Sequence, residues 1–341
     1  MSNSDPKRPK AVIFGCAGTE LTDEERRFFA AADPLGFILF ARNCDHPAQV
    51  RALTEALRQS VGRADAPVLI DQEGGRVRRL RPPHWRDVPA PGRFGEVYGR
   101  DAAAATEAVR INARLIAAEL VDLGIDVNCL PVLDLPIDGA HQAIGDRAFS
   151  GDPAIATRLG EAALAGLTDQ GVTGVIKHMP GQGRARVDSH HELPVVDAGL
   201  DDLAAHDLAP FRALSGHAWG MTGHVLYPAV DADLPATLSP RVIATLIRGA
   251  IGFDGLLLTD DLNMSALSGA LEDRAAAAVA AGCDIALHCS GVLAEMRRVA
   301  AKVPGLSEDG ERRCRRNRRP MVQSQAAERQ QLTDRLAELL A

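Results

Sequence analysis

The chain contains acidic residues and a histidine that could carry out nucleophilic and acid–base chemistry. Asp260 follows the run Leu256-Leu257-Leu258-Thr259, where a carboxylate can act as a nucleophile, a base or a metal ligand. Asp188 and His190 are two positions apart. In an extended segment their side chains lean the same way, so the carboxylate can bond one imidazole nitrogen and orient the other outward. Such a pair is suited to general acid–base catalysis.

Two further runs carry polar side chains suited to holding a substrate. Asp71 opens the first, which contains two adjacent glycines and ends at Arg79, and Lys177-His178 opens the second. A carboxylate can accept hydrogen bonds from sugar hydroxyls, and an arginine can hold that carboxylate or the substrate; the alternative is a salt-bridged turn. Gly181 and Gly183 indicate a loop that can move. Further candidates at the same kind of position are Asp134, Arg147, His224 and His288.

The elements that must position these residues alternate regularly along the chain. Short apolar runs, which predict buried strands, are each followed by a longer helical pattern, and eight such units lie between about residues 11 and 303. Eight strand–helix units predict a closed (β/α)8 barrel, whose chemistry lies in the loops after the strands. An open doubly wound sheet is the alternative, but the first strand is not followed by the Gly-x-Gly-x-x-Gly pattern. We expect one catalytic barrel domain over 1–304.

The segment 305–341 differs in composition from the rest of the chain. It contains the basic run 312–319, closed by Pro320, and then leucines at helical spacing. We expect a basic linker followed by an amphipathic C-terminal helix. The other interpretation of the run is a contact with nucleic acid or an anionic surface, but the whole chain carries a formal charge of −7, which argues against it.

Composition narrows the class of protein further. The 341 residues include six scattered cysteines without a Cys-x-x-Cys pair, which argues against a disulfide framework or a zinc cluster and for a reducing, cytoplasmic compartment. The polar start of the chain predicts no signal peptide, and no apolar run approaches a membrane span. We expect a monomer with no metal, no cofactor, and no nucleic-acid or membrane partner. Aromatic residues make up only 4%, which favours a small pocket over a long polysaccharide cleft.

At the chemical motifs the sequence resembles glycoside hydrolase family 3, and within it the bacterial β-N-acetylglucosaminidases of cell-wall recycling. The motifs occur in the family's order over nearly the whole predicted barrel. They are Asp71-Gln72-Glu73-Gly74-Gly75-Arg76-Val77, Ile144-Gly145-Asp146-Arg147, Lys177-His178-x-Pro180-Gly181-x-Gly183, Asp188-Ser189-His190 and Thr259-Asp260-Asp261-Leu262-Asn263-Met264.

The resemblance implies a role for each matching residue. Asp260 matches the nucleophile, and His190 matches the acid/base, assisted by Asp188. Residues that match positions gripping the N-acetylglucosamine hydroxyls are Asp71, Arg79, Arg147, Lys177 and His178. Two positions depart from the family: Met179 stands where Phe is usual and Gln182 where His is usual. Both lie in the loop region, so they bear on loop dynamics or leaving-group preference more than on the reaction.

The resemblance therefore implies an exo-acting, retaining β-N-acetylglucosaminidase that acts on peptidoglycan fragments (anhydro-muropeptides) through a covalent glycosyl-enzyme. A phosphorylase is an alternative, because a neutral imidazole base does not repel phosphate. A β-glucosidase is another, although those relatives usually have Trp where Asp261 stands. A metal-dependent barrel hydrolase would use His224, His288 and Asp260, and a non-catalytic sugar-binding barrel would lack Asp260 or His190.

Overall fold

Eight parallel strands close into a barrel in the computed structural model, which describes residues 8–189, 191–216, 219–316 and 318–341. Each strand pairs with the next along the chain, and β8 closes the circle on β1. The predicted (β/α)8 architecture is confirmed. The strands are β1 (Lys10–Phe14), β2 (Pro34–Leu39), β3 (Val68–Ile70), β4 (Val127–Asn128), β5 (Thr173–Met179), β6 (Trp219–Thr222), β7 (Leu256–Asp261) and β8 (Ile285–His288).

The strands are apolar because both of their faces are buried. One face fills the barrel and the other lies under helices, so β2 and β5 are buried along their whole length. In β7, Leu256–Thr259 are buried and the two acids that follow are partly exposed. The strand therefore delivers Asp260 and Asp261 to the rim.

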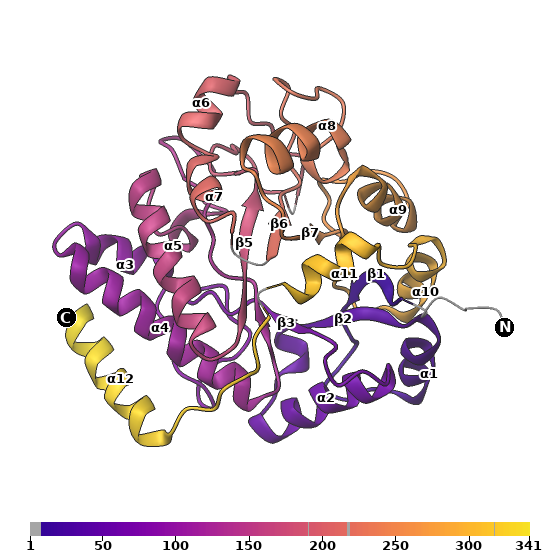
Figure 1. Cartoon of the computed structure of the whole chain (residues 1–341), viewed down its shortest axis with the longest axis horizontal. Coiled ribbons are helices and arrows are strands. Elements are labelled where there is room, and N and C mark those ends of the chain that lie inside the picture. The colour runs from indigo at the N-terminus through magenta and orange to yellow at the C-terminus, as the bar shows by residue number, and fades with distance from the viewer. Residues whose placement is uncertain (1–7, 190, 217–218, 317) are drawn as a thin grey trace.

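Helices surround the barrel in the order of the chain (Figure 1). Several of them start at a side-chain cap: Thr22 and Glu25 form a reciprocal capping box, and Asp152 accepts from the backbone N–H groups of Ala154 and Ile155. The helices are α1 (Asp23–Ala32), α2 (Pro47–Ser60), α3 (Pro91–Tyr98), α4 (Ala102–Asp122), α5 (Pro153–Thr168), α6 (Leu200–Ala205), α7 (Ala209–Ala213), α8 (Pro240–Val242), which continues as a π-helix over Ile243–Ala250, α9 (Leu271–Ala281), α10 (Leu293–Lys302), α11 (Glu308–Arg315) and α12 (Ala326–Leu340).

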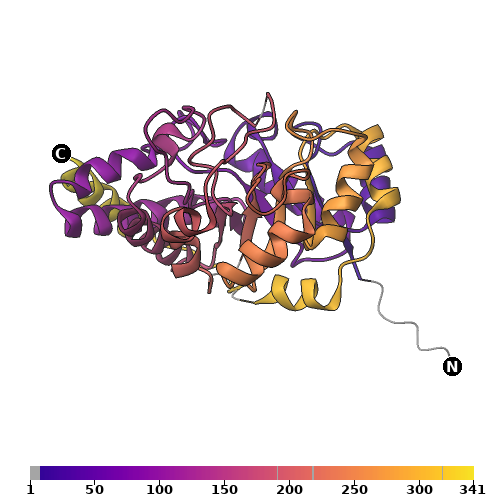
Figure 2. The ribbon, with the colours of Figure 1, turned by 90° about the horizontal axis from the view of Figure 1, so that it is seen from above.

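The two ends of the barrel are built differently (Figure 2). Long connections gather at the end where the strands finish, and α11 lies across the opposite end. The barrel thus presents its loops at the rim that carries Asp260, which is where barrel enzymes place their chemistry.

Only part of the basic run after the eighth unit is the linker that we expected. Its first half belongs to α11, and its arginines pair with acids that precede strands: Arg313 contacts Asp254 and Asp284 at 3.0 Å each. These partners lie 29 or more positions away in the sequence, so a local pattern could not reveal them. The charges hold α11 against the barrel, which favours a packing role over contact with nucleic acid.

The amphipathic C-terminal helix, α12, packs along α4, and its Leu336 is buried there. Arg114 of α4 pairs with Glu328 of α12 at 2.5 Å. The second helix of the tail therefore adds to the outer layer of the barrel.

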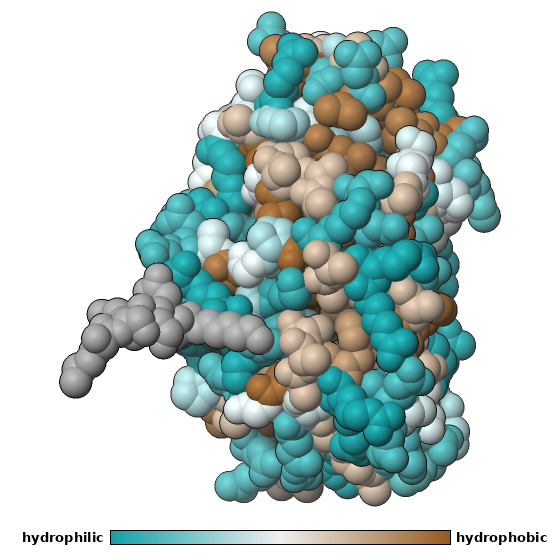
Figure 3. Space-filling model, turned by 90° about the vertical axis from the view of Figure 1, so that its right-hand side faces the viewer, coloured by the Kyte–Doolittle hydropathy of each residue, from teal (hydrophilic) through white to brown (hydrophobic). Residues whose placement is uncertain are grey.

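The polarity of the surface and the length of the helices bear on whether the described residues include a membrane-spanning segment. On the face seen in Figure 3, hydrophilic side chains surround and separate the apolar ones. None of the helices that the structure describes combines the length and the apolar run that a bilayer crossing needs.

Candidate active site

A pocket of about 250 Å³ opens at the rim where the strands end. Its walls come from residues that follow β3 and from the last residues of β5 and β7, together with the segment 141–147 and the loop after β5. The pocket collects most of the predicted site residues: Asp71, Arg79, Arg147, Lys177, His178, Asp188 and Asp260 all line it. Its size suits a small ligand rather than a polymer chain.

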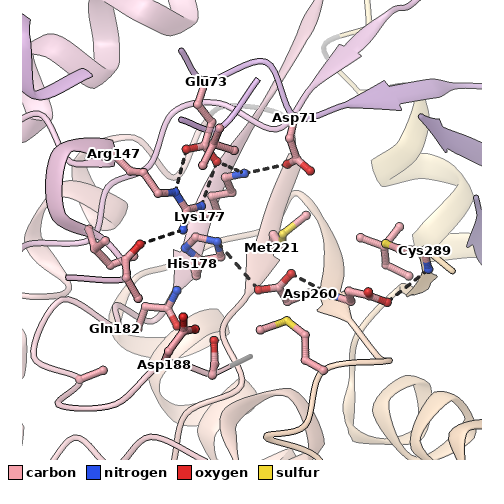
Figure 4. Close-up of a pocket in the computed structure, with 18 of the residues that line it drawn as sticks. Asp71, Glu73, Arg147, Lys177, His178, Gln182, Asp188, Met221, Asp260 and Cys289 are labelled. Atoms are coloured by element: carbon pink, nitrogen blue, oxygen red, sulfur yellow. Dashed lines mark hydrogen bonds and ion pairs between the residues drawn. The ribbon is translucent and has the colours of Figure 1, made fainter. Parts of the chain in front are cut away.

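A network of buried charges forms one wall (Figure 4). Lys177, whose side chain is only 2% exposed, lies 2.9 Å from Asp71 and 2.6 Å from Glu73. Arg79 binds the second oxygen of Asp71 at 2.9 Å. Arg147 binds Glu73 in a two-pronged pair, with both contacts at 2.9 Å.

The network fixes the charge state of its members. Burial alone would raise the pKa of Glu73, but Lys177 and Arg147 outweigh it and lower that pKa to about 2. Burial is likewise outweighed at Asp71, where Lys177 and Arg79 hold the pKa well below its ordinary value. In turn, Asp71 and Glu73 overcome the burial of Lys177 and raise its pKa. The wall is therefore ionised and rigid at neutral pH.

Asp260 faces this wall from the end of β7, with its side chain 19% exposed. Its Oδ1 accepts the backbone N–H of Asp261 at 2.8 Å, and its Oδ2 lies 3.9 Å from His178 Nε2. Burial opposes ionisation, but positive charge on His178 and His224, together with the Asp261 N–H, brings the pKa of Asp260 below its ordinary value. An ionised carboxylate at the pocket wall is chemically able to attack an electrophilic carbon.

His178 is held by a buried acid behind it. Its Nδ1 lies 2.6 Å from Oδ2 of Asp134, which follows β4 and whose side chain is fully buried. The backbone N–H of Gln182 donates to the other oxygen of Asp134 at 2.8 Å. The rim candidate Asp134 is thus part of the site without lining the pocket.

The loop after β5 covers part of the pocket. Ala185, Val187, Asp188 and Ser189 all line it, and the backbone N–H of Ala266 donates to Ser189 O at 3.2 Å, so the loop reaches the segment after β7. Asp188 therefore lies at the pocket, as expected. His190, the predicted acid/base, lies outside the described residues.

The two positions that depart from the family have different surroundings. Met179 is buried in an apolar cluster beneath the rim, whereas Gln182 lines the pocket. Only the second can touch a ligand directly.

The histidines of the metal hypothesis do not converge with Asp260. His224 bonds Thr237 Oγ1 at 2.7 Å through Nδ1 and the backbone oxygen of Asp261 at 3.0 Å through Nε2. His288 contacts Ser290 Oγ at 3.1 Å. Within the ranges that the structure describes, no three His, Cys, Asp or Glu side chains gather in a way that could hold a metal ion.

Sequence reasoning missed Glu73 as a site residue in its own right. The signal was present, because Glu73 is two positions after Asp71 and extended backbone points both side chains the same way. It also missed Asp261 as a titrating group: burial raises the pKa of Asp261 to about 6, with a smaller contribution from Asp260.

The fold and the pocket together define the class of the protein. A closed parallel barrel with an ionised carboxylate and a wall of fixed charges at its mouth is typical of barrel enzymes that act on polar small substrates. Comparison with protein families identifies the family within this class: residues 16–318 match the glycosyl hydrolase family 3 N terminal domain. The chain belongs to glycosyl hydrolase family 3 and is a glycoside hydrolase.

Curated proteins and solved structures are similar to this chain over most of its length. A Beta-hexosaminidase of Alkalilimnicola ehrlichii is 42% identical over 82% of this chain and 80% of its own length, and one of Bordetella avium is 39% identical over 83% and 81%. Among solved structures, native NagZ from Neisseria gonorrhoeae is 32% identical, with a TM-score of 0.89 over 98% of this chain and 99% of its own. The same NagZ has been solved in complex with N-trifluoroacetyl-D-glucosamine.

Proposed function

We propose that this chain is an exo-acting, retaining β-N-acetylglucosaminidase that removes terminal N-acetylglucosamine from peptidoglycan fragments (anhydro-muropeptides) in the cytoplasm, as a monomer. The observation that carries the proposal is the ionised Asp260 facing Lys177 and His178 across a pocket sized for a small ligand. The relatives named Beta-hexosaminidase and the NagZ complex with an N-acylated glucosamine support the choice of sugar.

In the first chemical step Asp260 attacks the anomeric carbon. A bond forms between its Oδ2 and that carbon while the bond to the leaving oxygen breaks, and the protonated imidazole of His190 gives its proton to that oxygen. The negative charge of Asp260 is consumed in the ester of the glycosyl-enzyme. Asp188 stabilises the charged imidazole and sets which nitrogen carries the proton, as the acid does in other catalytic triads.

In the second step a water molecule displaces Asp260 from the anomeric carbon of the sugar. The neutral His190 takes one proton from the water as its oxygen bonds the anomeric carbon, and the ester bond breaks to regenerate the carboxylate. Two inversions leave the β configuration unchanged. Retaining glycosidases usually use a second carboxyl group for the proton transfers, and here the loop imidazole takes that part.

Substrate binding uses the charged wall. Each oxygen of Asp71 bonds one cation and keeps a second lone pair that can accept from a sugar hydroxyl. Arg147 and Arg79 line the pocket beside it and have further N–H groups to donate. An exo mode of action follows from the size of the pocket.

Hydrolysis of an aryl β-N-acetylglucosaminide, compared with the β-glucoside and with or without phosphate, tests the proposal. We expect turnover of the first substrate only, with no acceleration by phosphate and no loss with a chelator. Asp260→Asn should reduce turnover by at least ~10²-fold. Asp169→Asn, which alters an exposed acid at the end of α5, is the matched control and should retain full activity.

Several results would contradict the proposal. Faster release with phosphate would indicate a phosphorylase, and preference for the glucoside would indicate a β-glucosidase. Unchanged turnover in Asp260→Asn would rule out Asp260 as the nucleophile.

The covalent mechanism has a test of its own. Intact-protein mass spectrometry of enzyme quenched during slow turnover should show one added N-acetylglucosaminyl group, which Asp260→Asn abolishes.

A further inference from the structure

Asp134 is a buried acid that touches the pocket only through other residues. Its side chain follows β4, is 0% exposed, and both of its oxygens face N–H donors. Oδ2 contacts His178 Nδ1 at 2.6 Å, and Oδ1 accepts from the backbone N–H of Gln182 at 2.8 Å. The backbone N–H of His178 lies 3.3–3.4 Å from both oxygens.

These contacts decide where the imidazole carries its proton. An ionised carboxylate only accepts hydrogen bonds, and backbone N–H groups only donate them. The backbone N–H groups of His178 and Gln182 on both oxygens of Asp134 are donors suited to a carboxylate, and with the acid as a carboxylate Nδ1 of His178 is the donor in the 2.6 Å contact. Nδ1 therefore keeps its proton in both charge states of the ring, and any proton gained or lost is exchanged at Nε2.

Nε2 is the nitrogen that faces the nucleophile. It lies 3.9 Å from Asp260 Oδ2, which is too long for a direct hydrogen bond. When the ring is neutral, Nε2 of His178 and Oδ2 of Asp260 are both acceptors and face each other across a gap. A donor group of the substrate can occupy that gap. In the opposite tautomer Nε2–H would point at Asp260 across this gap, and its positive end would stabilise the carboxylate and weaken it as a nucleophile.

The same acid also holds the start of the loop that carries Asp188. Through Gln182 it fixes the backbone where the chain leaves β5. The next residue, Gly183, lies so close to Leu135 that an added Cβ would be 2.0 Å from the Leu135 carbonyl oxygen. The position of the ring and the root of the loop therefore depend on one carboxylate.

We propose that Asp134 is a positioning residue that keeps His178 protonated at Nδ1, so that its Nε2 accepts a hydrogen bond from the sugar beside Asp260. The inference deepens the proposed function and rests on it for the identity of the sugar. The proton placement itself does not depend on which sugar is hydrolysed.

The first test is ¹⁵N NMR of the histidine-labelled full chain, with the His178 signals identified by their loss in His178→Gln. At a pH where the ring is neutral, the wild type should show a protonated Nδ1 and an unprotonated Nε2. Asp134→Asn can present its amide N–H to Nδ1 and should move the proton to Nε2. A wild-type ring protonated at Nε2 overturns the proposal, whether or not the variant folds and whatever the substrate proves to be.

The second test is a double-mutant cycle on kcat/KM, because an effect transmitted through His178 cannot add to the loss of His178. Asp134→Asn should reduce kcat/KM by about ten-fold or more, the scale of one hydrogen bond. Combined with His178→Gln, it should cause little further loss. Full additivity would show that Asp134 acts independently of the ring and would overturn the proposal.

A buried acid at the other end of the barrel gives the matched control. Asp126 accepts from the backbone N–H of Val68 and pairs with Arg58 at 3.3 Å. Asp126→Asn should lower the free energy of unfolding without moving the His178 nitrogen signals. If it moved them as Asp134→Asn does, the signals would report general loosening, and the proposal would be overturned.

Discussion

We expect Glu73→Gln to lower the free energy of unfolding by far more than the same change at an exposed acid would. Glu73 is completely buried and bonds Arg147 twice and Lys177 once. The amide removes the negative charge and replaces one oxygen by a donor, so it turns an N–H group toward a cation. Both cations remain in the pocket wall, and Lys177 keeps only Asp71 as a charged partner.

The size of the effect follows from the charge state of Glu73. Its pKa of about 2, against an ordinary value of 4.5, corresponds to roughly 3 kcal/mol of stabilisation of the ionised form. Breaking a buried pair by removing one partner costs ~3–5 kcal/mol, which agrees. Because the pKa is lower in the folded state, this contribution is present above pH 4.5 and is lost as the pH falls toward 2.

Urea unfolding at pH 7 and at steps down to pH 3 measures the contribution of Glu73 to the free energy of unfolding and the direction in which it changes with pH. The matched control is Glu96→Gln: Glu96 also pairs with an arginine, Arg93, at 3.0 Å, but the two side chains are 68% and 47% exposed. We expect a loss of about 3 kcal/mol for Glu73→Gln at pH 7 and less than ~1 kcal/mol for the control. The gap between wild type and Glu73→Gln should narrow below pH 4.5. Equal losses in the two variants, or a gap that does not change with pH, would refute the reasoning.

Two further substitutions test other charges of the structure. The pKa of Asp261 is raised to about 6, so ionisation of this acid lowers the stability of the folded state as the pH rises from 3.8 through 6. Asp261→Asn should therefore be more stable than wild type by about 1–2 kcal/mol at pH 8 and no more stable below pH 4. Thermal unfolding at both pH values measures this difference. Arg313→Ala should cost about 1–3 kcal/mol in urea unfolding because it removes one arginine partner from each of two acids at the base of the barrel, one of them buried. Arg315→Ala, whose side chain is 76% exposed, should cost less than ~0.5 kcal/mol; similar costs would mean that α11 is not held by its charges.

The barrel was predictable because its signal is local. Each strand is a short apolar run and several helices start with a side-chain cap, so counting units from β1 to β8 gives the architecture. The residues that end strands could then be placed at one rim without knowing any distance. That is how Asp71, Lys177 and Asp260, which are far apart in the sequence, were expected together.

The parts that escaped prediction depend on partners that local patterns do not show. The basic run looked like a linker because Asp254 and Asp284, which neutralise it, precede β7 and β8. Glu73 looked like part of a turn motif because its partners, Arg147 and Lys177, are 74 and 104 positions further along the chain. In both cases burial pairs a charge with a distant one, and only the closed barrel brings them together.

The charge balance of the pocket bears on the choice between water and phosphate as the acceptor. Among the lining residues that the structure describes, four are cationic and five are acidic: Arg76, Arg79, Arg147 and Lys177 against Asp71, Glu73, Asp188, Asp260 and Asp261. Each of the four cations is already paired with an acid, so they present no surplus positive charge. A neutral imidazole base removes one obstacle to phosphate, but an anion entering this pocket would still meet fixed carboxylates and compete with them for every cation. A neutral sugar meets no such opposition, since it needs only the remaining lone pairs and N–H groups. The electrostatics therefore favour water in the second step.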